Sequence, residues 1–409
     1  MTAVLTQRTA LPALFALMLG AFAIGTTEFV AIGILPGVAA DLRLTLPAAG
    51  WMVGIYALGV VVGGPLLTAL TGRVPRKWLL VGAMALFTLA NAVVALSASY
   101  ALLLAARGVG AFAHGVFFGI GASVAAGLVP PERRAAAIAM VFSGLTLAVA
   151  TSVPLGTFLG QALGWRATFW AVAGLGLLSA LAMAGLLPGS IATTRPGSLR
   201  EQARVLGSGR LLMAFGMNVF GYGGTFVAFT YLAAILEQVT GFGPERVSQL
   251  LVLYGVSVIA GNAIGGRLVD RDPLPVLAVM FTLQAAVLAA FGFTAASAPG
   301  TVATLALMGA LSFCNVPGLH LYVLQLARRY RPGAIDTASA INISAANLGI
   351  ALAALVGGRV VDSPLGLAAT PWVGACVVMV ALGLTLWSGW LDRRHPPGES
   401  SLPDDATGP

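Results

Sequence analysis

Residues 11–36 read LPALFALMLGAFAIGTTEFVAIGILP and contain a single ionisable side chain, Glu28. About 20 consecutive apolar residues in a helix cross the hydrocarbon core of a bilayer, so this run predicts a membrane-spanning helix. A carboxylate inside such a helix is costly and usually faces a cavity, where it acts in transport. The stretch therefore predicts both the type of fold and a first candidate functional residue.

Apolar runs of similar length recur along all 409 residues, of which 58% are hydrophobic and 9% are charged. Soluble proteins carry about 25% charged residues, and a membrane β-barrel shows short alternating strands rather than continuous apolar runs. We therefore expect an all-α polytopic membrane protein. Its twelve transmembrane helices are predicted near residues 11–35, 50–71, 78–97, 101–127, 135–160, 167–187, 211–236, 247–269, 274–295, 301–327, 335–361 and 369–390.

The basic residues are distributed unevenly between the two sides of the predicted bundle. Twelve spans place both termini on one side, and 17 of the 22 Lys and Arg residues fall in segments on that side. The positive-inside rule makes this side cytoplasmic. The net charge of +8 lies in loops between apolar runs, so we expect the lipid bilayer, and not a nucleic acid, as the partner. The four basic residues on the opposite side are Arg43, Arg166, Arg246 and Arg359.

The longest internal loop is polar and basic, and it divides the chain into two groups of six helices. We expect an N-terminal bundle over 1–187, a cytoplasmic linker over 188–210 and a C-terminal bundle over 211–390. Residues 391–409 form a tail rich in Pro and Gly, which predicts disorder.

The two groups of helices are related by an internal repeat. A shift of 198 positions places residues 22–75 on 220–273 without a gap, and a later shift of 201 aligns Gly108 with Gly309 and Pro131 with Pro332. Two homologous halves around an axis along the membrane normal imply a transporter with its site at their interface. Identities at the first shift include Phe22 with Phe220, Gly25 with Gly223, Thr27 with Thr225, and Tyr56 with Tyr254.

Four features make the sequence resemble the major facilitator superfamily over essentially its whole length. They are GTTEFVAIGILP at 25–36, the loop TALTGRVPRKWLL at 68–80, Arg107, and PLGTFLGQALGWRATF at 154–169. The chain is most similar to the twelve-helix drug:proton antiporter branch, near the arabinose-efflux-like and chloramphenicol-efflux-like proteins. The resemblance implies two pseudo-symmetric six-helix bundles, no cofactor, no metal and a monomer in the bacterial inner membrane.

Two motifs of that superfamily depart from their usual pattern here. In the loop after the second helix, Gly72 stands where the superfamily has Asp, whereas the copy GGRLVDR at 265–271 keeps its acid. The fifth helix has Val153 where exporters commonly have Gly. By resemblance, the cytoplasmic gate motif comprises Arg73, Arg76, Lys77, Asp270 and Arg271, and the exporter motif of the fifth helix comprises Pro154, Gly156 and Gly160.

Glu28 and Arg107 are the charged residues placed deepest in the first half. Each lies about seven residues from the same bilayer face, roughly 10 Å at 1.5 Å per residue, so the two lie at a similar depth. A Glu28–Arg107 pair spares both groups unpaired burial, although a static brace between two helices explains the same pattern. His114 lies seven residues from Arg107, on a similar helix face. We therefore expect proton coupling at Glu28, Arg107 and His114.

In the repeat, Glu28 aligns with Phe226 and Arg107 with Met308, so both charges belong to the first half. The second half offers polar side chains that either contact a substrate or pack helices against one another. These candidates for a substrate cavity are Asn218, Tyr222, Thr225, Tyr231, Asn315 and His320.

The sequence shows no phosphate-binding glycine loop, no metal-ligand cluster and no nucleophile beside a base, so we expect no enzyme. The function expected is proton-coupled export of a small organic compound, a sugar-like metabolite or an amphipathic drug, by alternating access. One alternative is a nutrient importer of the same fold, either a symporter or a uniporter. An alternative of another class is a membrane-embedded receptor or scaffold.

Overall fold

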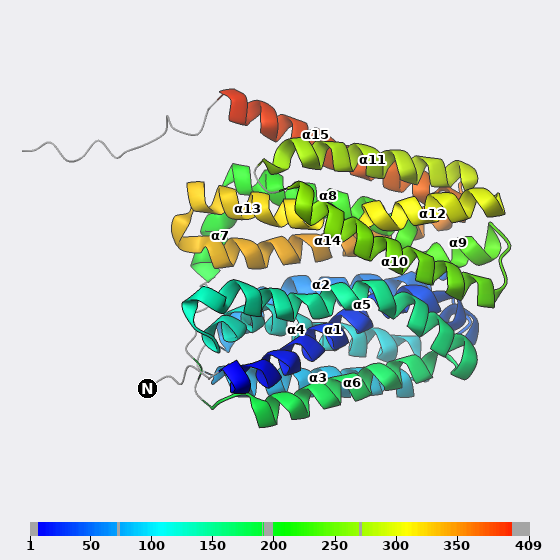
Figure 1. The fold of residues 1–409 in the computed structure, drawn as a ribbon. Helices are drawn as coiled ribbons and strands as arrows, with labels where there is room; N and C mark the ends of the chain where they lie inside the picture. The colour runs from blue at the N-terminus through cyan, green and yellow to red at the C-terminus, as the bar shows by residue number, and fades with distance from the viewer. Residues whose placement is uncertain (1–6, 72–73, 190, 192–198, 270–271, 395–409) are drawn as a thin grey trace, which may run out of the picture.

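The computed structural model describes residues 7–71, 74–189, 191, 199–269 and 272–394. These residues form a bundle of roughly parallel and antiparallel helices (Figure 1). The helices of the first half are α1 (Gln7–Asp41), α2 (Leu46–Leu70), α3 (Arg76–Leu96), α4 (Tyr100–Gly127), η1 (Pro131–Arg133), α5 (Arg134–Leu163) and α6 (Trp165–Leu186).

After α7 (Leu199–Leu206), the second half follows. Its elements are α8 (Gly209–Phe229), α9 (Leu232–Gln238), α10 (Pro244–Leu268), α11 (Pro273–Thr294), α12 (Ala298–Ser312), α13 (Val316–Tyr330), η2 (Pro332–Ala334), α14 (Ile335–Val361), η3 (Leu367–Ala369) and α15 (Thr370–Arg394).

Twelve segments of the described residues are long and apolar enough to cross a membrane, which confirms the predicted fold class. Two of the twelve are broken helices, α8 with α9 and α12 with α13, where the sequence predicted continuous spans over 211–236 and 301–327. Pro317 explains the second break, because its ring lacks an N–H and clashes with the preceding helical turn. No proline marks the first break, which coincides with the complete burial of Tyr231.

The boundaries of the linker and the tail also differ from expectation. The predicted linker 188–210 contains α7, and its last two residues, Gly209 and Arg210, already belong to α8. Helix α15 continues to Arg394, so residues 391–394 are helical and not part of a disordered tail. An ion pair between Arg210 of α8 and Asp392 stabilises this last helical turn of α15. Residues 395–409 lie outside the described part of the chain.

The internal repeat is visible in equivalent contacts as well as in sequence. Tyr56 contacts His114 in the first half, and Tyr254 bonds Ser312 in the second, with both partners offset by 198 positions. Gly63 packs against Phe112 as Gly261 packs against Ala310, at the same offset. Positive backbone φ angles occur at Arg43 and at Gly241, again 198 positions apart.

These contacts correct the predicted register of the fourth and tenth spans. The offset is still 198 at Ser312, so the counterpart of Arg107 is Leu305, and not Met308 as the 201-residue shift predicted. The offset becomes 201 at the short helices η1 and η2, which begin at Pro131 and Pro332. The three extra residues fall between α12 and α13, at Phe313, Cys314 and Asn315, where the helix breaks. The second half thus has three more residues than the first at this point, and they form an irregular segment inside the membrane span.

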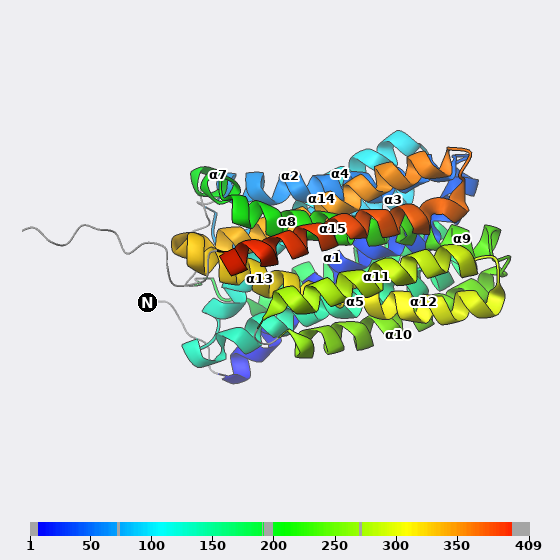
Figure 2. The same cartoon turned by 90° about the horizontal axis from the view of Figure 1, so that it is seen from above.

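The start of α1 and the end of α15 lie at the same end of the bundle, which we call the terminal end; the opposite end is the far end (Figure 1). The halves meet through α2 against α14 and α5 against α10, with a smaller contact of α1 with α9 (Figure 2). Near the far end, Ser248 of α10 donates to Gln161 Oε1 of α5 at 2.8 Å, and Gln161 Nε2 donates to the Pro244 carbonyl at 2.9 Å.

The hydrophobic core also joins the two halves toward the far end. One cluster contains the far parts of α1 and α2, such as Leu35 and Met52, together with residues throughout the second half, such as Leu236. A second cluster fills the terminal part of the first half, and the second half adds to it only Ile343 among the described residues. The halves therefore share a core at the far end and have separate packing at the terminal end.

Candidate functional site

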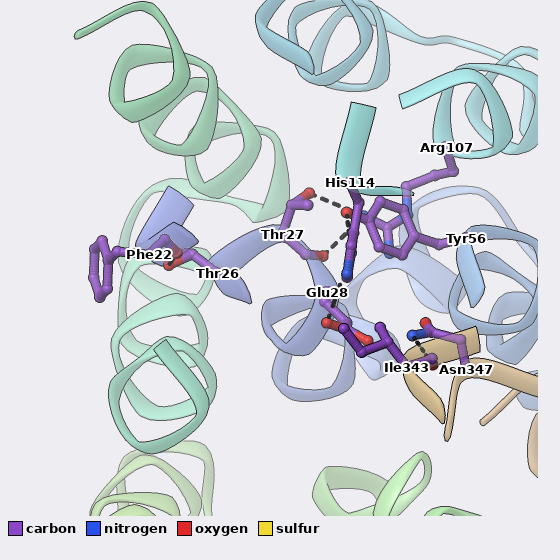
Figure 3. A network of polar contacts seen from close by, with 9 residues as sticks. All are labelled: Phe22, Thr26, Thr27, Glu28, Tyr56, Arg107, His114, Ile343 and Asn347. Atoms are coloured by element: carbon purple, nitrogen blue, oxygen red, sulfur yellow. Dashed lines mark hydrogen bonds and ion pairs between the residues drawn. The ribbon is translucent and has the colours of Figure 1, made fainter. Parts of the chain in front are cut away.

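Arg107 of α4 is buried inside the first half, where it connects three helices (Figure 3). Its Nη1 donates to the Thr27 carbonyl oxygen at 2.8 Å and to Thr27 Oγ1 at 3.0 Å, and its Nε donates to the Met52 carbonyl oxygen at 3.1 Å. The guanidinium carbon lies 4.3 Å from the centre of the Tyr56 ring, a favourable cation–π distance. Thr27 Oγ1 in turn donates to Asn91 Oδ1 of α3 at 2.6 Å. Arg107 therefore braces α1, α2 and α4.

Glu28 lies beside this brace and does not pair with it. No ion pair between described residues joins Glu28 to Arg107, although Arg107 bonds Thr27, the residue before Glu28, and therefore lies at a similar depth. Successive helical residues point about 100° apart, so Thr27 faces Arg107 while Glu28 points elsewhere. The hypothesis of a direct Glu28–Arg107 pair is therefore wrong, and Thr27 is the partner that sequence reasoning missed.

His114 is the ionisable side chain that lies within ion-pair distance of Glu28. Its Nδ1 lies 3.9 Å from Glu28 Oε2 and 3.3 Å from the Tyr56 hydroxyl. Glu28 is 7% exposed and makes no hydrogen bond to any described residue. A buried carboxylate without a hydrogen bond is unusual, since buried polar groups are normally satisfied. Glu28, His114 and Tyr56 thus form a buried polar group in which the Glu28 carboxylate keeps free hydrogen-bond acceptor capacity.

Aromatic rings from both halves meet next to Glu28. Phe29 of α1 lies 6.2 Å from Phe226 and 6.0 Å from Phe313, measured between ring centroids. Tyr222 stacks on Phe226 at 6.0 Å and meets Phe313 edge-on at 5.7 Å. We call Phe29, Tyr222, Phe226 and Phe313 the aromatic cluster. Tyr222, a predicted substrate residue, thus belongs to a cluster that also contains Phe29, the residue after Glu28.

Three other predicted substrate residues belong to buried amide networks. Asn218 Nδ2 donates to the Asn342 carbonyl oxygen and to Asn342 Oδ1, both at 2.9 Å. Gln284 of α11 donates through Nε2 to the hydroxyl of Thr225 and accepts from Asn315 Nδ2 at 2.8 Å. Sequence reasoning missed Gln284 and Asn342, although both are amides inside apolar runs, which is the signal that identifies intramembrane polar contacts.

Tyr231 and His320 lie apart from the aromatic cluster. The Tyr231 ring is fully buried against glycines of α2 and α14, and its hydroxyl reaches the Ala354 carbonyl oxygen at 3.4 Å. It therefore contributes to the contact between the halves near the far end. His320 of α13 is half-buried, with Nε2 3.5 Å from Ser339 Oγ of α14.

The motif of the fifth helix allows α5 to pack closely on α1. A Cβ at Gly156 would lie 1.9 Å from Val30 Cγ2, and one at Gly160 would lie 2.8 Å from Ile34 Cγ2. Pro154 is buried inside α5 without ending the helix. These residues therefore set the distance between two helices, one of which carries Glu28.

Only part of the gate motif lies in the described part of the chain. Arg73, Asp270 and Arg271 fall outside it. Lys77 Nζ donates to the Leu187 carbonyl oxygen at 2.8 Å, and Arg76 has a buried Nη1 without a partner. Among the described residues, no group of three or more His, Cys, Asp or Glu is arranged to hold a metal ion.

A buried carboxylate between two repeated six-helix halves is the arrangement of a membrane transporter, and the comparisons agree. Residues 17–335 match the family model of the Major Facilitator Superfamily. The chain belongs to this superfamily. It is therefore a transporter and not an enzyme, as the sequence motifs predicted. The xylose transporter XylE from E. coli, in a partially occluded inward-open conformation, matches with a TM-score of 0.71 over 96% of this chain and 98% of that chain. At 17% sequence identity, this structural match shows that the two chains share a fold.

Two relatives cover nearly the whole chain. The MFS-type transporter YtbD of Bacillus subtilis is 45% identical over 384 residues, which are 94% of this chain and 97% of that protein. The chloramphenicol resistance protein of Streptomyces lividans is 36% identical over 375 residues, 90% of this chain and 94% of that protein. The major facilitator assignment therefore holds for both halves.

Proposed function

We propose that this protein is a proton-coupled exporter of a small organic compound. The observation that carries the proposal is the Glu28 carboxylate, which is buried between repeated halves, lies 3.9 Å from His114 and has no hydrogen bond. An intramembrane carboxylate in this position is a functional group by default, because its burial is costly and no structural bond compensates for it. Proton and substrate compete for Glu28, so inward proton flow drives outward substrate flow.

The arrangement of the halves supports alternating access as the mechanism. If the terminal end is cytoplasmic, as the basic residues indicate, the far end is periplasmic. The shared core then closes the periplasmic end, and the separate packing at the terminal end corresponds to an inward-facing state. Rocking of one half against the other opens the far end in the second state. We propose a monomer in the bacterial inner membrane with both termini cytoplasmic.

Export, and not import, is favoured by the relative whose printed name is a resistance protein. The direction of flux decides between them. Purified protein reconstituted in liposomes, with a pH gradient imposed, is screened against a compound panel, with substrate and proton movement followed together. Opposite movement of proton and substrate supports the exporter, and movement in the same direction supports the importer.

The test of the proton site compares two chemically identical substitutions. Glu28→Gln removes the candidate site, and Glu237→Gln makes the same change on α9, outside it. We expect Glu28→Gln to fold and to lose flux driven by the pH gradient at least 100-fold, while Glu237→Gln keeps wild-type flux. Wild-type, gradient-dependent flux in Glu28→Gln contradicts the proposal and makes His114 the next residue to test.

A further inference from the structure

A chain of buried side chains links three spans of the second half. Gln284 of α11 donates through Nε2 to the hydroxyl of Thr225 on α8 and to the Gly221 carbonyl oxygen at 3.2 Å. Its Oε1 accepts from Asn315 Nδ2 at 2.8 Å, and Asn315 lies in the irregular segment between α12 and α13. Gln284, Thr225 and Asn315 are at most 1% exposed, so water does not compete for these bonds.

The Gly221 carbonyl oxygen fixes the orientation of the Gln284 amide. A carbonyl oxygen only accepts, so Gln284 Nε2 must face it, and Gln284 Oε1 is left facing Asn315. A side chain at this position must therefore donate on one side and accept on the other. Glutamine does both, whereas an apolar side chain of similar size does neither.

This chain of bonds is the counterpart, in the second half, of the Arg107 brace in the first. Thr27 and Thr225 are 198 positions apart, and each hydroxyl is hydrogen-bonded to an amide side chain from the third helix of its half, α3 or α11. In the first half Arg107 of the continuous helix α4 bonds Thr27 directly. In the second half the fourth span is broken, and Asn315 at its break is bonded through Gln284. The first brace thus holds a regular helix, and the second holds a break.

The segment that Asn315 anchors also carries Phe313, a member of the aromatic cluster. The Phe313 ring is 4% exposed and meets Phe29 of the first half edge-on, at 6.0 Å between ring centroids. Phe29 follows Glu28 and is the first residue of α1, counted from the terminal end, that belongs to the core shared by both halves. The contact of Phe313 with Phe29 therefore lies where the closed far end begins.

We propose that Gln284 is a positioning residue for transport, which fixes the Phe313–Asn315 segment so that the Phe313 ring closes the far end next to Glu28. Irregular backbone inside a membrane span persists where the surrounding protein holds it. Backbone groups at helix ends lose their intrahelical partners, so a break is fixed less firmly by its own hydrogen bonds than a continuous helix is. The bond from Gln284 supplies the missing constraint from a neighbouring helix.

The native thiol of Cys314 reports on this segment, because Cys314 follows Phe313 and is 4% exposed. The sequence has two cysteines, so Cys376→Ser gives a parent protein in which Cys314 is the remaining thiol. Its rate of reaction with a maleimide is measured on the purified full-length protein in detergent. We expect Gln284→Leu to raise this rate about tenfold, because the loss of a buried hydrogen bond shifts a local opening equilibrium by about that factor. Equal rates in Gln284→Leu and the parent overturn the proposal.

Further variants separate the bond from a general loss of stability. Asn315→Leu removes the same bond from its other side, so the double variant with Gln284→Leu should label no faster than the single variants, whereas independent effects would multiply and contradict the proposal. The isosteric Gln284→Glu, whose protonated carboxyl offers one donor and one acceptor, should restore the parent rate at pH 6, and labelling as fast as in Gln284→Leu would contradict the hydrogen-bonding role. Thr385→Val on α15, which removes a buried hydroxyl bonded to the Ala381 carbonyl oxygen, is the control and should label like the parent.

The closing role of Phe313 is tested as a leak. Liposomes contain the protein with Glu28→Gln, so that proton exchange at that carboxylate does not contribute, and the decay of an imposed pH gradient is followed without substrate. Adding either Gln284→Leu or Phe313→Ala is expected to speed the decay about fivefold, and adding Thr385→Val to leave it unchanged. An unchanged decay in both Gln284→Leu and Phe313→Ala overturns the proposal. Neither assay uses a substrate or the Glu28 carboxylate, so this inference and the proposed function stand or fail separately.

Discussion

Gly255 of α10 allows the two halves to touch in the state described here, and its replacement by Ala should favour the other state. A Cβ at Gly255 would lie 1.9 Å from the Ala150 carbonyl oxygen of α5, whereas real Cβ atoms keep at least 3.0 Å. The helices must therefore separate by about 1.1 Å, the difference between these two distances. The obstacle is backbone, so no side-chain rotation relieves it.

Overpacking of this kind costs about 1–3 kcal/mol. The cost applies only where α5 and α10 are in contact, whereas the helix propensity gained on replacing Gly by Ala, about 1 kcal/mol, applies in both states. A difference of 1–3 kcal/mol between two states changes their ratio about 5- to 150-fold. We therefore expect Gly255→Ala to raise the population open at the far end by at least fivefold.

The assay uses a cysteine introduced at Ser248, which is 8% exposed and lies in the contact between the halves. On a background in which Cys314 and Cys376 are replaced, the rate of reaction with a maleimide in detergent reports opening of the far end. Gly82→Ala is the matched control, because nothing lies within 4 Å of a Cβ there. Equal labelling rates in Gly255→Ala and Gly82→Ala would refute the reasoning, since they require α5 and α10 to stay in contact in both states.

Two further predictions concern the brace and the orientation. Arg107→Lys should lower stability by about 3 kcal/mol, because Lys cannot bond Thr27 and Met52 together while stacking on Tyr56. The loss of stability is measured as the melting temperature of Arg107→Lys in detergent, compared with that of the exposed control Arg246→Lys. Equal melting temperatures in the two variants would show that the brace is dispensable. Single cysteines at Ala98 and Pro299 should react with an impermeant thiol reagent in intact cells, and one at Gly207 should not, because the basic residues place the terminal end in the cytoplasm. Labelling of Gly207 from outside would reverse the orientation.

The sequence by itself determined the features that depend on one helix at a time. The bilayer requires long apolar helices with every backbone group bonded internally, so twelve spans can be recognised from local composition alone. The repeat of 198 residues, visible as matched identities, predicted two related halves. The similar depth of Glu28 and Arg107 followed from counting residues along two helices, because the rise per residue is constant.

Only the tertiary structure decided which groups meet. Depth along a helix is a local property, but the direction of a side chain depends on how the helix is rotated against its neighbours, and that rotation is set by packing along its whole length. For this reason Arg107 bonds Thr27 and not Glu28. The burial of Tyr231 between α2 and α14 and the hydrogen bond of Asn218 to Asn342 depend on contacts between segments over 100 residues apart, which no local pattern specifies.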